Sequence, residues 1–439
     1  MDKLPGSLLL HILSRLDDSA DVARCRVAWK AFDAVYPGLR SINLRWSLKW
    51  YYSSRSRVSD SQRIKHFQTV FLDLISKLET VESVSIGVEK PLSYSLLYES
   101  DSHLTDGDSA KEWLSRVSGS LKSLSISDRF GHRPTNIFPL ISVYCHSLVK
   151  LKLEFVWLNM HNMNPMPMLT NLPLRFTHLK DEDLNELNKC FPNLQNLSLV
   201  GVRGLRDPKI HLLNLKTCFF MVNNECPTLT LITPSLIKLL IECITPAALH
   251  VEAPMLSRFY LGLNPLKLTV KRFENLKTLL LDSYIGSLLS QFPITKTVQR
   301  LILNSDYLVT GDAKLTLGKV FTVFPNVRYL CIKSGAWSEL EACLNVNGQE
   351  ILDGRKGLKI ICAYLKLVDP SLTFSSVACV LDQCLSLSKV SLLIHTDVED
   401  TVSNGFMSKC MTRWPGLKWR WGTWSEEVKD SWIINGASN

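Results

Sequence analysis

Apolar side chains recur along most of the chain in the spacing LxxLxL. In the central part, successive units start at Leu194, Leu215, Leu236, Leu256, Leu276 and Val298, which are 20 to 22 residues apart. Similar starts occur at Val81, Leu121, Leu148, Val327, Leu358 and Leu387. Within a unit the fourth and sixth positions are also apolar, as a strand with one buried face requires. Such a strand cannot bury its face alone, so the spacing predicts stacked units with a continuous core.

Helical patterns occupy the longer intervals and the N-terminus. Apolar residues recur on one face of a helix in 64–78, 113–117, 184–190 and 377–384. The first forty residues carry two such series, at Leu8, Leu9, Ile12, Leu13 and Leu16, then at Val22, Cys25, Trp29, Phe32 and Tyr36. Pro5 suits a first helical turn. Helices this short bury too little apolar surface to fold firmly alone, which predicts a partner.

The N-terminal run LPGSLLLHILSRLDDSADVARCRVAWKAF resembles an F-box. The residues at its characteristic positions are Leu4, Pro5, Leu8, Leu9, Ile12, Leu13, Leu16, Val22, Cys25, Lys30 and Phe32. The chain departs from the pattern at Ser7, Asp17 and Phe32, where an acid, a second proline and a tryptophan are usual. The resemblance implies that these residues bind a Skp-family adaptor and, through it, a cullin. The alternative is an ordinary helical hairpin that packs on the rest of the protein.

The repeat period lies within the range of leucine-rich repeats. Together with the N-terminal run, it makes the chain resemble a plant-type F-box/leucine-rich-repeat protein. We therefore expect an α/β fold, with a short N-terminal helical F-box followed by an irregular leucine-rich-repeat solenoid that has a parallel concave sheet. The expected boundaries are 1–40 for the F-box, 41–80 for a basic linker and connecting helix, 81–410 for the solenoid and 411–439 for a tryptophan-rich C-terminal cap. Leucines scattered in an ordinary α/β domain are the alternative.

The third and fifth positions of each unit flank buried positions, so their side chains should point to the concave surface. Basic and aromatic residues are well represented there, and the target-binding candidates are Lys150, Lys152, Phe219, Lys238, Arg258, Tyr260, Arg300 and Tyr329. No acid occupies the third or fifth position in the units that start at Leu148, Leu194, Leu215, Leu236, Leu256, Leu276, Val298 and Val327. Such a surface favours a target segment with acidic or phosphorylated residues and an apolar anchor.

The formal net charge of the 439 residues is +9. The segment from Arg40 to Lys65 contains seven Lys or Arg residues and a single acidic residue, Asp60. Tryptophan and tyrosine residues lie between the basic ones. A basic aromatic stretch can bind nucleic acid through phosphate contacts and stacking. A solvated linker with aromatics packed against the first repeat is the interpretation we favour, and nucleic acid is not an expected partner.

The sequence contains no signature of catalysis or of cofactor binding. It has no GxSxG, HExxH or GxxxxGK[ST] motif. The 12 cysteines are widely spaced without a CxxC pair, so we expect buried free thiols in a reducing compartment and no metal site. No apolar run reaches the ~18 residues of a membrane-spanning helix. We expect an intracellular protein, in the cytoplasm, the nucleus or both, without membrane contact.

The family resemblance implies the substrate-recognition subunit of an SCF-type ubiquitin ligase, which is not itself an enzyme. Its F-box would dock on a Skp-family adaptor, and its repeats would bind a target protein for ubiquitination. The alternative function is a leucine-rich-repeat scaffold or a nucleic-acid-binding protein that uses the basic aromatic stretch 40–65. Adaptor binding and salt-dependent binding of RNA or DNA distinguish the two.

Overall fold

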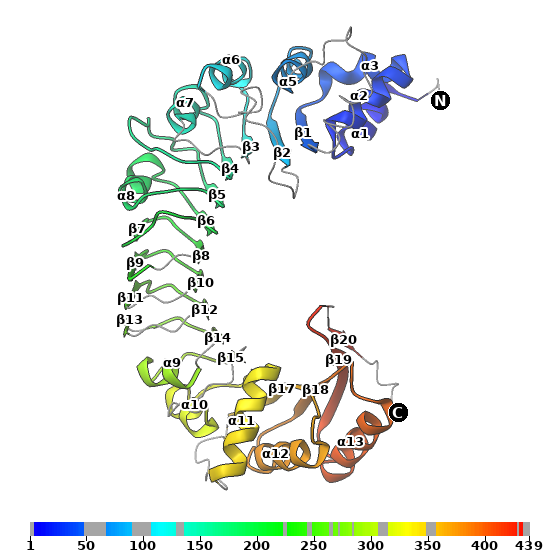
Figure 1. Ribbon diagram of the computed structural model, residues 1–439, viewed down its shortest axis with the longest axis vertical. Coiled ribbons are helices and arrows are strands. Elements are labelled where there is room, and N and C mark those ends of the chain that lie inside the picture. Colours follow the sequence, from blue (N-terminus) through cyan, green and yellow to red (C-terminus); the bar gives the residue numbers. More distant parts are fainter. Residues whose placement is uncertain are drawn as a thin grey trace, which may run out of the picture. The chain divides into compact units, whose positions relative to one another are not determined.

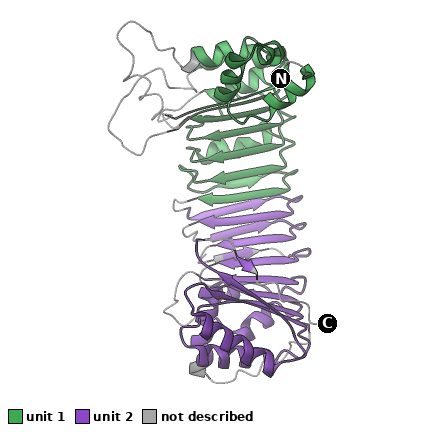
Figure 2. Ribbon diagram, turned by 90° about the vertical axis from the view of Figure 1, so that its right-hand side faces the viewer, with its two compact units in different colours: residues 1–224 green, residues 225–439 purple. Residues whose placement is uncertain are grey.

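The computed structural model of the chain describes residues 4–47, 67–89, 107–128, 136–222, 226–243, 248–262, 267–270, 273–282, 285–305, 315–347, 357–427 and 430–432. The chain divides into two compact units, Met1–Asn224 and Glu225–Asn439, which Figure 2 shows in different colours. No helix within the described ranges is long and apolar enough to cross a membrane.

Unit 1 starts with three helices, α1 (Gly6–Ser14), α2 (Ser19–Ala28) and α3 (Lys30–Val35), followed by a 3-10 turn at Tyr36–Gly38. Pro5 is the residue before α1, and the Asp18 side chain caps α2 by accepting a hydrogen bond of 2.9 Å from the Ala20 amide. Leu9, Leu13 and Val22 are buried in this helical part. The helical prediction for the first forty residues is thus confirmed.

A parallel sheet follows in unit 1. Its strands, in spatial order, are β1 (Ser41–Ser47), β2 (Ser83–Glu89), β3 (Ser123–Asp128), β4 (Lys150–Glu154), β5 (Asn171–Arg175), β6 (Asn196–Val200) and β8 (Thr217–Val222). The chain between β6 and β8 contains the short strand β7 (Lys209–His211). The helices α5 (Phe67–Ile75), α6 (Gly107–Val117), α7 (Ile137–Tyr144) and α8 (Asp181–Cys190) lie on one side of the sheet (Figure 1). Side chains alternate between buried and accessible along these strands, as the repeat pattern predicts.

Two strands of this sheet were not among the predicted units. Strand β1 lies in the segment expected to be linker, and its inward residues Ile42 and Leu44 follow buried Leu39 in the LxxLxL spacing. Strand β5 contains Pro173, which has no amide hydrogen for the ladder. The pairing of β5 with β4 is correspondingly incomplete, since only the pairs at Asn171, Leu174 and Arg175 are formed.

The turns after β4, β5 and β6 contain left-handed residues. The φ angles are 60° at Phe155, 50° at Phe176 and 63° at Gly201, and the two phenylalanine rings stack with centroids 5.0 Å apart. Beyond these turns, short parallel bridges connect Trp157 with His178 and His178 with Arg203. The backbone of unit 1 therefore makes a second row of contacts outside the sheet.

Unit 2 contains parallel strands β10 (Lys238–Cys243), β12 (Arg258–Gly262), β14 (Thr278–Asp282), β15 (Arg300–Asn304), β16 (Tyr329–Ile332), β17 (Ile360–Leu365), β18 (Lys389–His395) and β19 (Lys418–Trp424) in this spatial order. Strand β20 (Ser431–Trp432) pairs antiparallel with β19. The segment predicted to be a tryptophan-rich cap thus contributes strands to the sheet, and its capping role stays a prediction.

The return segments of unit 2 depend on repeat length. In the shortest repeats they form a second parallel sheet of β9 (Thr228–Ile232), β11 (Ala248–Glu252) and β13 (Lys267–Val270). The later returns hold helices α9 (Ile285–Gln291), α10 (Leu317–Val323), α11 (Ser334–Asn347), α12 (Pro370–Asp382) and α13 (Asp400–Arg413). A repeat of about 20 residues leaves room only for an extended return, whereas a longer one accommodates several helical turns.

All 12 cysteines are free thiols, and all except the half-buried Cys25 and Cys379 are buried. Burial raises the pKa of Cys145, Cys218 and Cys410 to about 12, which keeps these thiols protonated and unreactive. Within the described residues, no group of three or more His, Cys, Asp or Glu side chains is arranged to hold a metal ion.

Candidate adaptor and target-binding surfaces

Helix α1 and the residues before it expose an apolar stripe, formed by Leu4, Leu8 and Ile12. Their exposed fractions are 38%, 43% and 39%. The residues are four apart and therefore lie on one face of the helix. Large apolar side chains in a row on a surface mark a site of interaction more often than isolated ones do. This apolar stripe contains the exposed large aliphatic side chains of the predicted adaptor set.

The other predicted adaptor residues divide by burial. Leu9 and Leu13 on α1, and Val22 on α2, are at most 3% exposed and belong to the core of the helices. Pro5 and Lys30 are exposed, whereas Leu16, Cys25 and Phe32 are half-buried. The ring of Phe32 packs edge-on against Trp29, with centroids 5.1 Å apart. The predicted set thus contains both surface residues and residues that build the helical core.

Hydrogen bonds attach the helices to the start of the sheet in unit 1. The Tyr36 hydroxyl donates to the Leu74 carbonyl over 2.9 Å in a buried position, and burial raises the pKa of this phenol. The Asn43 amide of β1 donates to Ser19 Oγ over 2.9 Å, and the Asn43 side-chain amide donates to the Asp17 carbonyl. The adaptor surface is therefore joined to the sheet by directed contacts.

The predicted target-binding residues of unit 1 lie on the accessible face of its strands. Lys150 is exposed, whereas Lys152 and Phe219 are half-buried. Lys152 Nζ lies 2.9 Å from Glu154 Oε1, and Glu154 follows at the seventh position of the same repeat, which the prediction left out. This carboxylate offsets the charge of Lys152, one of the two lysines that the sequence pattern indicated for β4.

In unit 2 the remaining predicted residues share one sheet face. Strand register places Lys238 beside Arg258 and Arg300 beside Tyr329, and the Arg300 guanidinium carbon lies 4.0 Å above the Tyr329 ring. Tyr260 is half-buried next to these strand starts. Lys238, Arg258 and Arg300 are exposed. The structure thus brings five predicted residues together in unit 2 and keeps the other three in unit 1.

The alternative nucleic-acid surface, 40–65, lies mostly outside the described residues, which end at 47 and resume at 67. Of its described members, Arg40 is paired with Glu82 over 2.8 Å. Glu82 also contacts Lys122 over 3.0 Å. The structure therefore places one of the seven basic residues in an ion-pair network at the start of the sheet.

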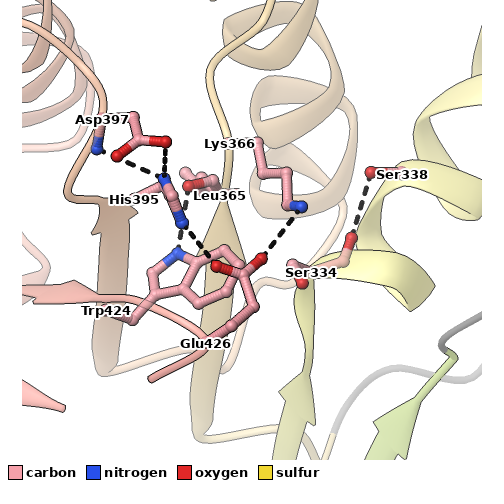
Figure 3. A network of polar contacts seen from close by, with 8 residues as sticks. All are labelled: Ser334, Ser338, Leu365, Lys366, His395, Asp397, Trp424 and Glu426. Atoms are coloured by element: carbon pink, nitrogen blue, oxygen red, sulfur yellow. Dashed lines mark hydrogen bonds and ion pairs between the residues drawn. The ribbon is translucent and has the colours of Figure 1, made fainter. Parts of the chain in front are cut away.

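A polar network that the sequence did not indicate connects the C-terminal segment to the ends of β17 and β18 within unit 2 (Figure 3). Glu426 lies 2.9 Å from His395 Nε2 at the end of β18 and 3.2 Å from Lys366 Nζ after β17. The Asp397 amide donates to His395 Nδ1 over 3.3 Å, and the Trp424 indole donates to the Leu365 carbonyl over 3.2 Å. The contacts of Glu426 and Trp424 in this network join residues 31 to 60 positions apart in the chain, so no local motif could reveal them.

The same C-terminal part covers the sheet face of the last repeats. Tyr364 donates its hydroxyl hydrogen to Asp430 over 2.6 Å, which together with burial raises the tyrosine pKa. Cys331, Cys362, Tyr364, Leu393 and Trp424 form a buried apolar cluster on that face. Strands β17 and β18 are consequently buried on both sides. The accessible face of unit 2 is therefore confined mainly to its earlier strands and to the strand starts.

Acid should release Glu426 from this network. The hydrogen bond from His395 and the contact with Lys366 lower the pKa of the Glu426 carboxyl to about 2. A carboxyl with a lowered pKa stabilises the folded state above its unfolded pKa of about 4.3, and this contribution is lost as the pH falls toward 2. We expect amide exchange in 424–427 to accelerate between pH 4 and pH 2, measured by hydrogen exchange corrected for intrinsic rates.

Glu426→Gln should remove most of this acid-dependent change, and Glu427→Gln, at the exposed neighbouring carboxylate, should retain it. An unchanged acid response in Glu426→Gln would show that another group controls this segment.

Comparison with known proteins gives two relatives. An F-box/LRR-repeat protein of Arabidopsis thaliana is 35% identical over 450 aligned residues, covering 99% of this chain and 100% of the relative. An F-box protein of Arabidopsis thaliana is 26% identical over 243 residues, covering 53% of this chain and 51% of the relative. No family model matches the chain.

Proposed function

Because the chain belongs to the F-box/LRR-repeat protein family, we propose that it is the substrate-recognition subunit of an SCF-type ubiquitin ligase. In this role the N-terminal helices bind a Skp-family adaptor and, through it, a cullin. The repeats bind a target protein, and other subunits carry out ubiquitin transfer. The proposed contribution of this chain is to hold the target, which raises the effective concentration of target lysines near the conjugating enzyme.

The observation that carries this proposal is the apolar stripe of Leu4, Leu8 and Ile12. The helices already have a core of their own, in which Leu9 and Leu13 are buried. The stripe is therefore surplus to the folding of the helices, and its exposure has an unfavourable hydration cost that a partner would remove. Full burial of each large aliphatic side chain contributes roughly 1.5–3 kcal/mol, so three of them can anchor a stable complex.

Ile12→Asp should abolish adaptor binding while the protein remains folded. It removes an apolar contact and brings an unpaired carboxylate into the interface. We expect affinity to fall at least about 100-fold, which corresponds to about 2.8 kcal/mol. The measurement is co-expression with a plant Skp-family adaptor, followed by size-exclusion chromatography of the intact chain, the variant and a chain lacking residues 1–40.

Leu385→Asp is the matched control, since Leu385 is a 91% exposed leucine in unit 2 and receives the same charge. It should co-elute with the adaptor as the unmodified chain does. Co-elution of Ile12→Asp with undiminished affinity would contradict the proposed docking surface. Failure of the unmodified chain to bind any adaptor, together with salt-dependent binding of RNA, would favour the nucleic-acid alternative.

A further inference from the structure

Each of the eight parallel strands from β10 to β19 in the larger sheet of unit 2 has a basic residue at its first position or directly before it. On the first four strands of the order these are Lys238, Arg258, Lys277 and Arg300, all exposed. Lys238, Arg258 and Arg300 occupy the first residue of β10, β12 and β15 and share one register row, in which Thr278 fills the position on β14. Lys277 directly precedes Thr278, so each of these strands contributes one cation to the same edge.

The next four strands continue the pattern with Arg328, Lys359, Lys389 and Lys418. Lys389 and Lys418 are register partners at the starts of β18 and β19. Arg328 and Lys359 directly precede β16 and β17, and the Lys359 amide donates to the Arg328 carbonyl over 2.9 Å. We call the eight residues, one for each strand from β10 to β19 in the sheet, the basic ladder.

Acidic residues are absent from the sequence positions that supply the basic ladder, and four of its members have no carboxylate close by in the part of the chain that the structure describes. The second and third positions of the eight repeat units, where these strands start, contain no Asp or Glu. Among the described residues, no carboxylate lies within ion-pair distance of Arg258, Lys277, Arg328 or Lys359. In unit 1 the corresponding edge differs, because Glu82 binds both Arg40 and Lys122. An array of cations this regular raises the local concentration of an anionic partner.

An apolar row runs beside the first half of the basic ladder. Leu240, Tyr260, Leu280 and Ile302 are register neighbours on the accessible face, two residues further along β10, β12, β14 and β15. All four are half-buried. A partner that covers both rows needs negative groups along one side and apolar groups along the other.

This combination fits a peptide better than a nucleic acid. Single-stranded nucleic acids bind through exposed aromatic platforms. The two candidate rings are engaged within the protein, because the Tyr260 hydroxyl donates to Asp282 over 2.7 Å and Tyr329 lies beneath Arg300. Aliphatic side chains next to cations instead suit carboxylates and apolar residues of one polypeptide.

The length of the basic ladder sets the length of its partner. Neighbouring strands are about 4.8 Å apart, so eight strand starts span roughly 34 Å. An extended chain advances about 3.3 Å per residue, and about ten residues therefore cover this distance. The residue spacing of the peptide differs from the spacing of the strands, but long Lys and Arg side chains are flexible enough to reach acidic groups that are not directly opposite them.

We infer that the strand starts of unit 2 bind an acidic peptide segment of about ten residues, rich in Asp, Glu or phosphorylated residues, with apolar side chains that contact the row from Leu240 to Ile302. The inference rests on the proposed function, in which the segment belongs to the protein to be ubiquitinated. It gives that target a chemical class and assigns its contact to one edge of one sheet.

The test uses the complex of the full chain with a Skp-family adaptor. The probe is a fluorescein-labelled decapeptide of alternating glutamate and leucine, and fluorescence anisotropy measures its affinity at 0.05 and 0.2 M salt. The triple variant Arg258→Glu, Lys277→Glu and Arg300→Glu should bind the peptide at least tenfold more weakly. Binding by the unmodified complex should weaken with salt, because exposed charges are screened.

The matched control reverses three exposed lysines on helices, Lys111→Glu, Lys189→Glu and Lys409→Glu, which changes the net charge equally. It should stay within about twofold of the unmodified complex. Equal loss in the two triple variants would show a general charge effect and overturn the inference. Tighter binding of a twelve-nucleotide DNA strand than of the peptide would also overturn it.

Adaptor co-elution in the same samples separates this inference from the proposed function. The basic-ladder variant should keep the adaptor, which also shows that it is folded. The triple variant with glutamine in place of glutamate should give an intermediate loss of peptide binding, because it removes attraction without adding repulsion. If the chain binds the peptide through the basic ladder but binds no adaptor, the proposed function fails while the binding surface stands.

Discussion

Leu13→Ala is expected to lower the free energy of unfolding of the N-terminal helices by about 2–5 kcal/mol. Leu13 is 0% exposed, and Leu9, Val22 and Tyr36 are buried in the same part of unit 1. Truncation removes apolar burial and leaves a cavity that a small helical core cannot fully close. Hydrogen exchange of the amides in Gly6–Ser14 measures the change, which should appear as faster exchange of α1.

Ile12→Ala, one residue earlier, provides the comparison. Ile12 is 39% exposed, so its truncation removes less burial and should leave α1 protected. It should nevertheless weaken adaptor binding, because Ile12 belongs to the apolar stripe. Equal protection of α1 in the Leu13→Ala and unmodified chains would mean that Leu13 does not support the helices in solution.

Gly204→Ala is expected to destabilise unit 1 by about 2 kcal/mol, the usual size of the cost for a non-glycine residue held at a positive φ. Gly204 has a φ of 95°, and a Cβ atom there would lie 2.8 Å from both the Leu179 carbonyl oxygen and His178 Cε1. An alanine residue would thus combine a disfavoured backbone conformation with a collision against main chain that cannot rotate away. We expect a decrease of about 4–8 °C in the melting temperature of unit 1, measured by calorimetry.

Gly119→Ala is the control for this substitution. A Cβ atom at Gly119 would have nothing within 4 Å, and its φ is outside the positive range. The expected change in melting temperature is small. If Gly204→Ala melts at the same temperature as Gly119→Ala, the turn around Gly204 is free to adjust, and the parallel bridges of His178 and Arg203 add little to the stability of unit 1.

The fold could be predicted from the sequence wherever the buried apolar residues keep a regular spacing. Five nearly equal intervals between Leu194 and Val298 predict neighbouring strands, and the observed register of Arg258, Thr278 and Arg300 agrees with them. The period is harder to recognise where another signal is stronger. Basic residues around Ile42 and Leu44 resemble a linker, and Pro173 is unfavourable in a strand.

The sequence motif predicted which residues belong to the adaptor site, but only the structure shows which of them are buried and which are exposed. A motif groups Leu8, Leu9, Ile12 and Leu13 because all are apolar. Helical phase separates them, because Leu8 and Ile12 share one face and Leu9 and Leu13 share the next one. Which face the other helices cover is a property of tertiary packing, and it decides that Leu9 and Leu13 are buried.

The prediction of the target surface used only the third and fifth positions of each repeat and therefore missed residues at other positions. The second position, where the chain enters the strand, is also accessible and supplies Lys277, Arg328 and Lys359 to the basic ladder. The seventh position supplies Glu154, which binds Lys152. Glu154 continues the alternation of Lys150 and Lys152, so the prediction missed it only because it stopped at the fifth position. The second position precedes the alternating part of the strand, so the period of two could not reveal its cations.

Under the proposed function, two hydrogen bonds affect which target lysines are modified. They join Tyr36 to Leu74 and Asn43 to Ser19. Because directed bonds join the N-terminal helices to β1 and to α5, rotation of the adaptor would carry the first strands of unit 1 with it. A part of the target that contacts these strands, in addition to the acidic segment on unit 2, would keep one orientation toward the catalytic subunits. Its modified lysines would then be selected by their position on the target surface, and a lysine on the opposite side would stay unmodified even in a tight complex.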